Sequence, residues 1–285
     1  MRVPGLMLSV TAVVAVAVAC APADQEARPT NQVDGVDCKK ENLATLTPGK
    51  ITFGTDQPVY EPWFVDDDPT NGKGFESAVA YALADELGYA REDVVWTRVP
   101  FNAAIQPGRK TYDADINEFS ITEERRQAVD FSAPYYDVDQ VAITLESSKA
   151  ASVKTLAELK SVKIGAQVGT TSFEAAQRLQ PEQDVAVYNT NDDAKAALRA
   201  GQIDALVVDL PTAFYITSAE LEDGVVIGQI PAGDGKPEQF GIVLDKGSPL
   251  TPCVSTAVEN LRADGTLARI EQEWLSSAST APELK

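Results

Sequence analysis

The sequence contains no histidine among its 285 residues. Without histidine, a chain cannot build a Ser-His-Asp triad, a Cys-His nucleophile pair or a metal site with a histidine ligand. An enzyme made from this chain would need carboxylates, lysine or tyrosine for its chemistry. We expect no metal and no cofactor.

Basic residues are scarce as well. The chain has 24 Lys and Arg against 43 Asp and Glu, which gives a formal net charge of −19 at pH 7. This acidity argues against a nucleic-acid partner, because phosphate binding requires a basic surface. With 44% hydrophobic residues the chain is too apolar to be disordered, and its length fits about two domains.

An uncharged apolar run, residues 6–19, follows Arg2 near the N-terminus. It is too short to span a bilayer and is typical of a secretory signal peptide, here residues 1–19. The run ends in Ala17-Val18-Ala19-Cys20, which resembles a bacterial lipoprotein signal in which Cys20 is lipidated and becomes the new terminus. Ala17 departs from that pattern, which prefers Leu there. The alternative is an ordinary signal peptide with a coincidental cysteine.

Residues 20–37 are polar and aperiodic, so we interpret them as a flexible tether behind the lipidated Cys20. The expected location is extracytoplasmic, at the outer face of the cell membrane or in the periplasm. Of the three cysteines, Cys38 and Cys253 then remain as a pair in an oxidising compartment, which favours a disulfide. The alternative is two unrelated buried thiols.

Strands and helices alternate from residue 51 onward. We expect strands at 51–54, 94–99, 114–117, 163–167, 185–188 and 205–208, and helices at 75–87, 172–180, 192–200 and 254–274, the last broken near Asp264-Gly265. Expected helix caps are Thr122, a capping box of Thr171 and Glu174, and Asn191. The alternation predicts an α/β protein with two Rossmann-like lobes and mostly parallel sheets.

Two similar extended segments, residues 140–145 and 239–244, flank the second block of alternation. We interpret them as a paired-strand hinge. Lobe 1 would then comprise 38–138 and 240–280, and lobe 2 would comprise 139–239. The alternative is that both segments are ordinary core strands of one domain.

Polar residues follow the expected strands at their carboxyl ends, where ligands bind in open α/β sheets. Arg125 can hold a carboxylate with two parallel hydrogen bonds. Backbone N–H groups of Thr170, Thr171 and Ser172 form an anion site at a helix N-terminus. Asp209 with Ser120 can accept from an ammonium group, and Tyr60 and Phe101 offer flat apolar faces. Together these groups suit a zwitterion.

The motifs that carry these residues resemble the polar-amino-acid family of type II periplasmic solute-binding proteins of ABC importers (family 3). The markers are GTDQPVYEPW (54–63), GFE (74–76), SITEERRQAVDFSAPYY (120–136), VGTT (168–171), AGQIDALVVD (200–209) and ADGTLARIEQEW (263–274). The chain has one residue more than the family between Asp56 and Tyr60, and residues 101–113 are one short.

The resemblance implies a monomeric receptor that closes two lobes around a free amino acid and docks on an ABC permease. It assigns the ligand carboxylate to Arg125 and 169–171, and the ammonium to Asp209, Ser120 and the backbone carbonyl of Glu118. For the ligand side chain, we add a set of candidates: Asp56, Tyr60, Phe101, Asn117, Glu118 and Phe119. The carboxylates favour a basic amino acid such as arginine, lysine or ornithine, with glutamine or another neutral polar amino acid as the alternative.

Simpler structural roles stay open for several of these residues. Arg125 could be a surface helix partner, Asp209 could begin a turn, and Tyr60 and Phe101 could be core aromatics. Glu118 could face solvent, and Asp56 could hold a loop on the hinge side.

The leading hypothesis is a binding protein rather than an enzyme. A cyclohexadienyl dehydratase-like enzyme on the same fold, with Glu118 as its acid–base group, and a sensory receptor are the alternatives.

Overall fold

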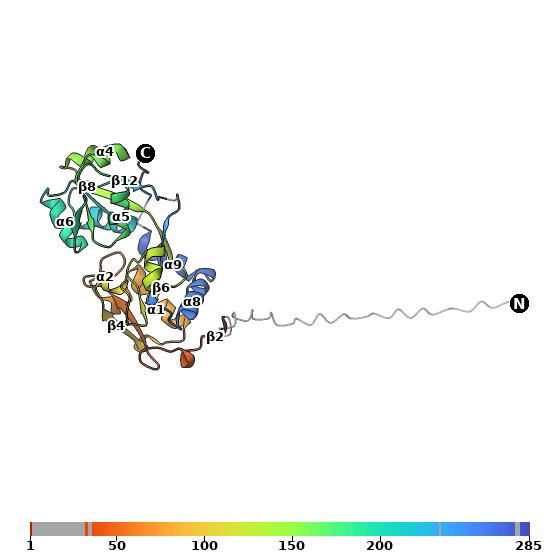
Figure 1. The fold of residues 1–285 in the computed structure, drawn as a ribbon. Coiled ribbons are helices and arrows are strands. Elements are labelled where there is room, and N and C mark those ends of the chain that lie inside the picture. Colours follow the sequence, from red (N-terminus) through yellow and green to blue (C-terminus); the bar gives the residue numbers. More distant parts are fainter. Residues whose placement is uncertain (2–31, 34–35, 234, 277–279) are drawn as a thin grey trace. The chain divides into compact units, whose positions relative to one another are not determined.

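Two separate five-stranded sheets form the core of the computed structural model, which describes residues 1, 32–33, 36–233, 235–276 and 280–285. We call each sheet with its helices a lobe (Figure 1). The predicted signal peptide and Cys20 lie outside the described residues after Met1. The last residues of the predicted tether form a short antiparallel pair, β1 (Gln32–Val33) with β2 (Val36–Asp37), so this part of the tether is structured.

Lobe 1 is built on a mixed sheet. Its strands, in spatial order, are β4 (Val94–Arg98), β3 (Ile51–Thr55), β5 (Ala114–Asp115), β14 (Val243–Asp245) and β6 (Val129–Phe131). The first three strands are parallel, and β14 enters antiparallel between β5 and β6. Every residue of β3 is buried, as expected for a central strand covered on both faces.

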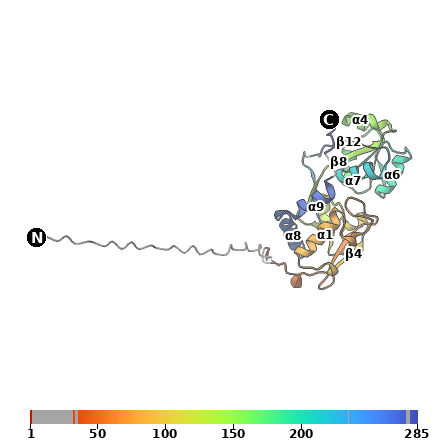
Figure 2. The same cartoon turned by 180° about the vertical axis from the view of Figure 1, so that it is seen from behind.

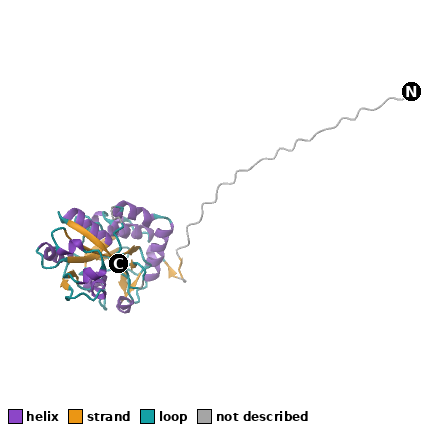
Figure 3. Ribbon diagram, turned by 90° about the horizontal axis from the view of Figure 1, so that it is seen from above, coloured by secondary structure: helices purple, strands orange, loops and turns teal. Residues whose placement is uncertain are grey.

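Helices surround the strands in Figure 3, and several of these helices belong to lobe 1. They are α1 (Phe75–Glu86), α2 (Phe101–Ala104), α3 (Glu123–Ala128), α8 (Thr251–Ala263) and α9 (Thr266–Leu275). Helices α8 and α9 pack beside α1 (Figure 2). Gly265, at φ 80°, separates them in the left-handed region that glycine adopts without strain, as the predicted break requires.

Lobe 2 repeats the arrangement. Its strands, in spatial order, are β10 (Ala186–Tyr188), β9 (Ile164–Gln167), β11 (Ala205–Asp209), β8 (Gln140–Leu145) and β12 (Gly224–Ile230). Its helices are α4 (Leu156–Lys160), α5 (Thr171–Arg178), α6 (Asn191–Arg199) and α7 (Leu210–Tyr215), the last continuing into a π-helical turn, Ile216–Glu220. The α/β class is confirmed, but the sheets are mixed rather than mostly parallel, because β8, β12, β14 and β6 pair antiparallel.

The hinge pairing differs from the prediction. Residues 140–145 do not pair with 239–244; they form the buried strand β8 in the lobe 2 sheet. The two-stranded element between the sheets is β7 (Tyr136–Val138) with β13 (Glu238–Phe240), antiparallel. The error has a physical cause, since a fully buried, mostly apolar strand such as QVAITL is typical of a sheet centre rather than of a narrow connector.

The chain returns to lobe 2 after α9. Gln229 of the edge strand β12 donates its N–H to the carbonyl of Pro282 (2.8 Å) and accepts from the N–H of Leu284 (3.0 Å). The side chain of Leu284 is buried in the lobe 2 core. We call residues 280–285 the tail; they add a short parallel rung to the lobe 2 sheet.

Helix caps are partly as predicted. Thr122 caps α3 by accepting from the N–H of Arg125, as expected. The predicted capping box of Thr171 and Glu174 is wrong, because Thr170 caps α5, and Thr190 rather than Asn191 caps α6. Among the described residues, no helix combines the length and apolar character needed to cross a bilayer.

The predicted disulfide is confirmed: Cys38 and Cys253 are bonded, with their Cα atoms 5.4 Å apart. Both cysteines are buried in the lobe 1 core and join the entry of the folded chain to α8. The bond closes a loop across 215 positions of sequence.

We therefore expect the variant Cys38→Ser/Cys253→Ser to lose about 2–5 kcal/mol of unfolding free energy, because a long loop is no longer closed in the unfolded chain. Urea denaturation of the variant and the wild type measures the loss. Wild type treated with a reductant serves as the control and should match the variant; identical midpoints for all three samples would contradict the prediction.

Candidate functional site

A cavity that is partly open to solvent lies between the two lobes. It lies where β3, β5, β9 and β11 end, the location expected for ligands in α/β sheets. Its lining residues come from both lobes: Asp56, Pro58, Tyr60, Phe101, Asn117, Glu118 and Arg125 from lobe 1, and Gln167, Thr170, Thr171, Ser172, Asn191, Val208 and Asp209 from lobe 2.

Arg125 is the cationic side chain of this cavity. It is 7% exposed, and its two terminal nitrogens donate to the carbonyls of Ser120 (2.7 Å) and Gly169 (2.9 Å). It forms no ion pair with any described residue. Burial lowers the pKa of its guanidinium. A guanidinium has five N–H donors, so this fixed cation keeps donors for an anion in the cavity.

The N-terminus of α5 faces the cavity beside Arg125. The hydroxyl of Thr170 caps the helix at the N–H of Phe173, and the hydroxyl of Ser172 donates to the side chain of Gln140 (2.6 Å). The first N–H groups of a helix have no partner within the helix. The backbone of Thr171 and Ser172 is therefore available to an anion at the same end of the cavity.

The side chain of Gln140, which the sequence analysis did not single out, connects Asp209 to the N-terminal end of α5. Its amide nitrogen donates to Asp209 Oδ1 (2.7 Å) and lies 3.2 Å from Glu238 Oε2. Burial, followed by the nearby Glu238 carboxylate, raises the pKa of Asp209 to about 8. Asp209 lines the cavity and is half-buried.

Glu118 is held in an unusual backbone conformation at the cavity wall. Its φ of 53° lies in the left-handed region, which costs a non-glycine residue about 1 kcal/mol or more. The buried carboxylate of Glu76, on α1, accepts its N–H (2.6 Å) and the hydroxyl of Tyr135. Burial, with Asp209 and Glu76 nearby, raises the pKa of Glu118 well above its usual value.

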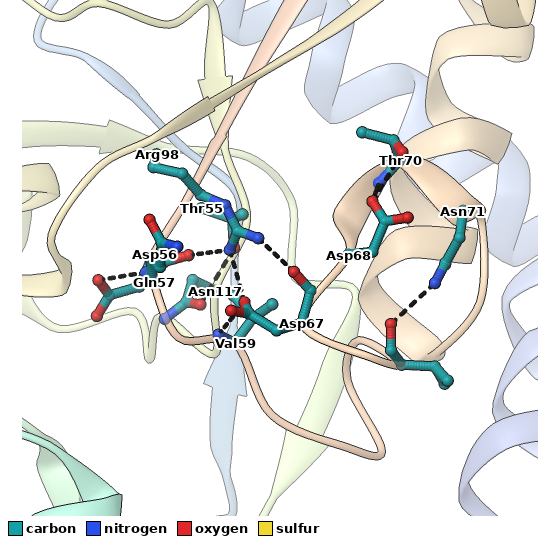
Figure 4. A network of polar contacts seen from close by, with 11 residues as sticks. Thr55, Asp56, Gln57, Val59, Asp67, Asp68, Thr70, Asn71, Arg98 and Asn117 are labelled. Carbon is teal, nitrogen blue, oxygen red and sulfur yellow. Dashed lines mark hydrogen bonds and ion pairs between the residues drawn. The ribbon is translucent and has the colours of Figure 1, made fainter.

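Arg98 holds the loop that carries Asp56 and Tyr60 into the cavity (Figure 4). Its guanidinium donates to the carbonyls of Asp56 and Asp67 (both 2.5 Å) and pairs with the Asp67 carboxylate (3.0 Å). That carboxylate also accepts the N–H of Val59 (3.0 Å). One arginine from β4 therefore connects the two ends of this loop. Burial raises the pKa of the Asp56 carboxyl.

Two of the three predicted aromatic residues line the cavity, and the third does not. Phe101 lines the cavity, and the Arg125 guanidinium lies 5.6 Å from its ring centroid. Tyr60 lines the cavity too, with Lys195 of α6 at 5.4 Å from its ring. Phe119 does not line it; its ring stacks on Phe101 at 4.7 Å inside the lobe 1 core. Phe119 supports the wall from behind.

Ser120 also lies outside the cavity lining. Its hydroxyl bonds Thr171 Oγ1 and Glu238 Oε2 (both 3.0 Å), and its carbonyl accepts from Arg125. Of the predicted ligand-binding residues, the cavity lining brings together Arg125, Thr170, Thr171, Ser172, Asp209, Glu118, Asp56, Tyr60, Phe101 and Asn117. The sequence analysis missed Pro58, Gln167, Asn191 and Val208 of the lining.

Acidic side chains outnumber basic ones in the cavity lining. The side chains of Asp56, Glu118 and Asp209 oppose the single guanidinium of Arg125. Glu76 lies directly behind Glu118, and the carboxylate of Asp115 is buried without a hydrogen-bond partner in the described chain. No group of His, Cys, Asp and Glu residues in the described part of the chain could hold a metal ion.

A family model extends these findings: that of the bacterial extracellular solute-binding proteins, family 3, matches residues 51–277. The chain belongs to this family. The match spans both lobes and all cavity-lining residues, and the family resemblance inferred from the motifs is confirmed.

Named relatives agree with the family 3 assignment. ABC transporter glutamine-binding protein GlnH of Bacillus subtilis (strain 168) is 30% identical over 251 residues, covering 84% of this chain and 86% of that protein. ABC transporter arginine-binding protein 1 of Escherichia coli (strain K12) is 28% identical over 243 residues, covering 81% and 95%. The crystal structure of the ancestral amino acid-binding protein AncCDT-1, a precursor of cyclohexadienyl dehydratase, is 30% identical, with a TM-score of 0.66 and coverage of 79% and 95%.

The buried Glu76 gives this family 3 protein a testable pH dependence. Burial raises its pKa from 4.5 to about 7. The stability that this carboxyl contributes is therefore fully present below pH 4.5 and is lost as the pH rises through 7. We expect Glu76→Gln to be more stable than wild type at pH 8, by up to about 3 kcal/mol, with the difference shrinking toward pH 5.

Urea denaturation at pH 5, 6.5 and 8 measures this difference. Glu259→Gln, an exposed position on α8, is the control and should leave the pH profile of wild type unchanged. Parallel profiles for Glu76→Gln and wild type would contradict the role assigned to Glu76.

Proposed function

We propose that this protein is the amino-acid-binding component of an ABC importer and that it binds a basic L-amino acid, such as arginine, lysine or ornithine, between its lobes. One observation carries the proposal: a buried arginine with unused donors lies in the same cavity as three carboxylates. Free amino acids with a basic side chain present one anion and two cations, which matches this pattern.

The carboxylate of the ligand fits the Arg125 end. The guanidinium is already fixed by two backbone carbonyls, so little side-chain entropy is lost when it binds an anion. The N–H groups at the start of α5 add neutral donors to the same anion. A carboxylate there restores charge balance around a desolvated cation.

The two amines of the ligand fit the acidic residues. Asp209, oriented by Gln140, serves the α-ammonium group together with the backbone carbonyl of Glu118, whereas the Glu118 side chain faces the side chain of the ligand. Asp56, on the loop held by Arg98, and Asn117, which follows β5, face the ligand's side chain with Tyr60 and Phe101 as flat walls. A neutral side chain would leave Asp56 or Glu118 without a counter-charge in a partly desolvated site.

The relatives support amino-acid binding, and two of them are named for ligands with different kinds of side chain. The Escherichia coli relative is named for arginine and the Bacillus subtilis relative for glutamine. The excess of acidic over basic side chains in this cavity favours the basic class, and glutamine is the alternative.

The transport role and the location extend the same proposal. The protein would deliver its ligand to an ABC permease as a monomer at the outer face of the cell membrane. The disulfide between Cys38 and Cys253 suits an oxidising, extracytoplasmic compartment. Lipidation at Cys20 would anchor it there.

A dehydratase-like enzyme is the second candidate, because AncCDT-1 is named as a precursor of cyclohexadienyl dehydratase. The raised pKa of Glu118 would suit a general acid. The buried cation and Asp209 are nevertheless placed for both ends of an amino acid, so we favour binding. Release of product from prephenate or arogenate would decide for the enzyme.

A thermal-shift screen tests the function directly, because a ligand that binds the folded state raises its melting temperature. The screen uses the twenty amino acids with ornithine and citrulline. We expect the largest shifts with basic amino acids; shifts confined to neutral ones would favour the glutamine alternative, and no shift at all would refute amino-acid binding.

Arg125→Ala should weaken arginine binding at least about a hundredfold, because two charge-assisted hydrogen bonds to the ligand carboxylate, about 3 kcal/mol together, are lost. Isothermal titration calorimetry measures the affinity. Arg126→Ala, the adjacent exposed arginine on α3, is the matched control and should bind as wild type does. Unchanged affinity in a folded Arg125→Ala protein would overturn the assignment.

Glu118→Gln should weaken arginine about tenfold more than it weakens glutamine, because the substitution removes a negative charge and keeps the shape of the side chain. Calorimetric titration of both ligands gives the ratio. The exposed Glu123→Gln on α3 is the control. An equal loss for both ligands would show that Glu118 does not select for charge.

A further inference from the structure

Contacts between the lobes extend beyond the cavity lining, and one of them forms a continuous chain. The indole nitrogen of Trp63 donates to Thr212 Oγ1 (2.7 Å), and Thr212 Oγ1 donates to Glu118 Oε2 (3.1 Å). Trp63 and Glu118 belong to lobe 1, whereas Thr212 lies on α7 of lobe 2. A hydroxyl of one lobe is thus held between two polar groups of the other.

The direction of both hydrogen bonds follows from the atoms. An indole N–H is only a donor, so Thr212 must accept from Trp63. The hydroxyl has a single proton, which it then gives to the Glu118 carboxylate. Each donor among the three groups therefore has an acceptor. Thr212 is the hydrogen-bond partner of Trp63 and of Glu118 at the same time.

Neither Trp63 nor Thr212 lines the cavity. Trp63 is fully buried against the rings of Phe75, Tyr136 and Phe240, at centroid distances of 5.5 to 5.8 Å. Thr212 is 2% exposed. Trp63 cannot follow Thr212 if the lobes separate, so the chain of hydrogen bonds exists only while the lobes are in contact.

We propose that Thr212 is a positioning residue that latches the two lobes together by joining Trp63 to Glu118, and that it thereby sets how long a bound ligand stays. This inference rests on the proposed function. When the lobes separate, water can form hydrogen bonds with Trp63 and Glu118. In the closed molecule, only Thr212 can form these two hydrogen bonds. The hydroxyl therefore stabilises the closed state selectively, and it also holds the Glu118 side chain at the cavity wall.

The test compares Thr212→Val, which keeps the volume and removes the hydroxyl, with Thr212→Ser, which keeps the hydroxyl. Stopped-flow tryptophan fluorescence measures arginine dissociation from the full chain. We expect Thr212→Val to release arginine about tenfold faster with a smaller change in association rate, and Thr212→Ser to retain nearly the wild-type rate. Thr217→Val is the matched control, because the Thr217 hydroxyl bonds only carbonyls of its own helix.

Several outcomes would overturn the latch. An unchanged dissociation rate in Thr212→Val would remove it, and an equally fast rate in Thr212→Ser would show that Thr212 acts by packing alone. If wild type binds no amino acid, the proposed function fails instead. Small-angle scattering of the ligand-free chain then decides the latch: a larger radius of gyration for Thr212→Val than for wild type and Thr212→Ser supports it, and equal radii overturn it.

Discussion

The guanidinium of Arg125 is buried at the meeting point of the lobes, and it is held by backbone carbonyls rather than by a carboxylate. The burial of this guanidinium is not fully compensated, because carbonyl dipoles offset only part of the hydration that a buried cation loses. One of its two carbonyl partners comes from lobe 1 and the other from lobe 2. The cation therefore ties the contact between the lobes to the arrival of an anion, and the other features of the site can be understood from this constraint.

The acidic residues of the cavity are held by hydrogen bonds rather than by ion pairs. Gln140 orients Asp209, Thr212 orients Glu118, and Arg98 holds the backbone of Asp56 rather than its carboxylate. None of the three carboxylates is neutralised by a close cationic side chain among the described residues. Burial consequently raises all three pKa values. Such groups hold their negative charge most readily when a positively charged ligand is present.

Much of the fold and site could be predicted from the sequence. Alternating apolar runs located most strands and helices, and the residues after parallel strands gave Asp56, Glu118 and Asp209. Gln140 escaped this reasoning because β8 runs antiparallel to β11, so its first residue, not its last, lies beside Asp209. The hinge was misplaced because the paired segments, β7 and β13, have three residues each and no periodicity to reveal them. Phe119 lies outside the cavity lining because its ring stacks on Phe101 inside the lobe 1 core.

The tail has a consequence for self-association. Strand β12 lies at the edge of the lobe 2 sheet, and an uncovered edge strand can pair with another chain. Pro282 and Leu284 form hydrogen bonds with the backbone N–H and carbonyl of Gln229, and the side chain of Leu284 is buried in the lobe 2 core. Loss of these contacts would uncover that edge together with the apolar surface that Leu284 covers, and would leave the edge open to pairing with another chain.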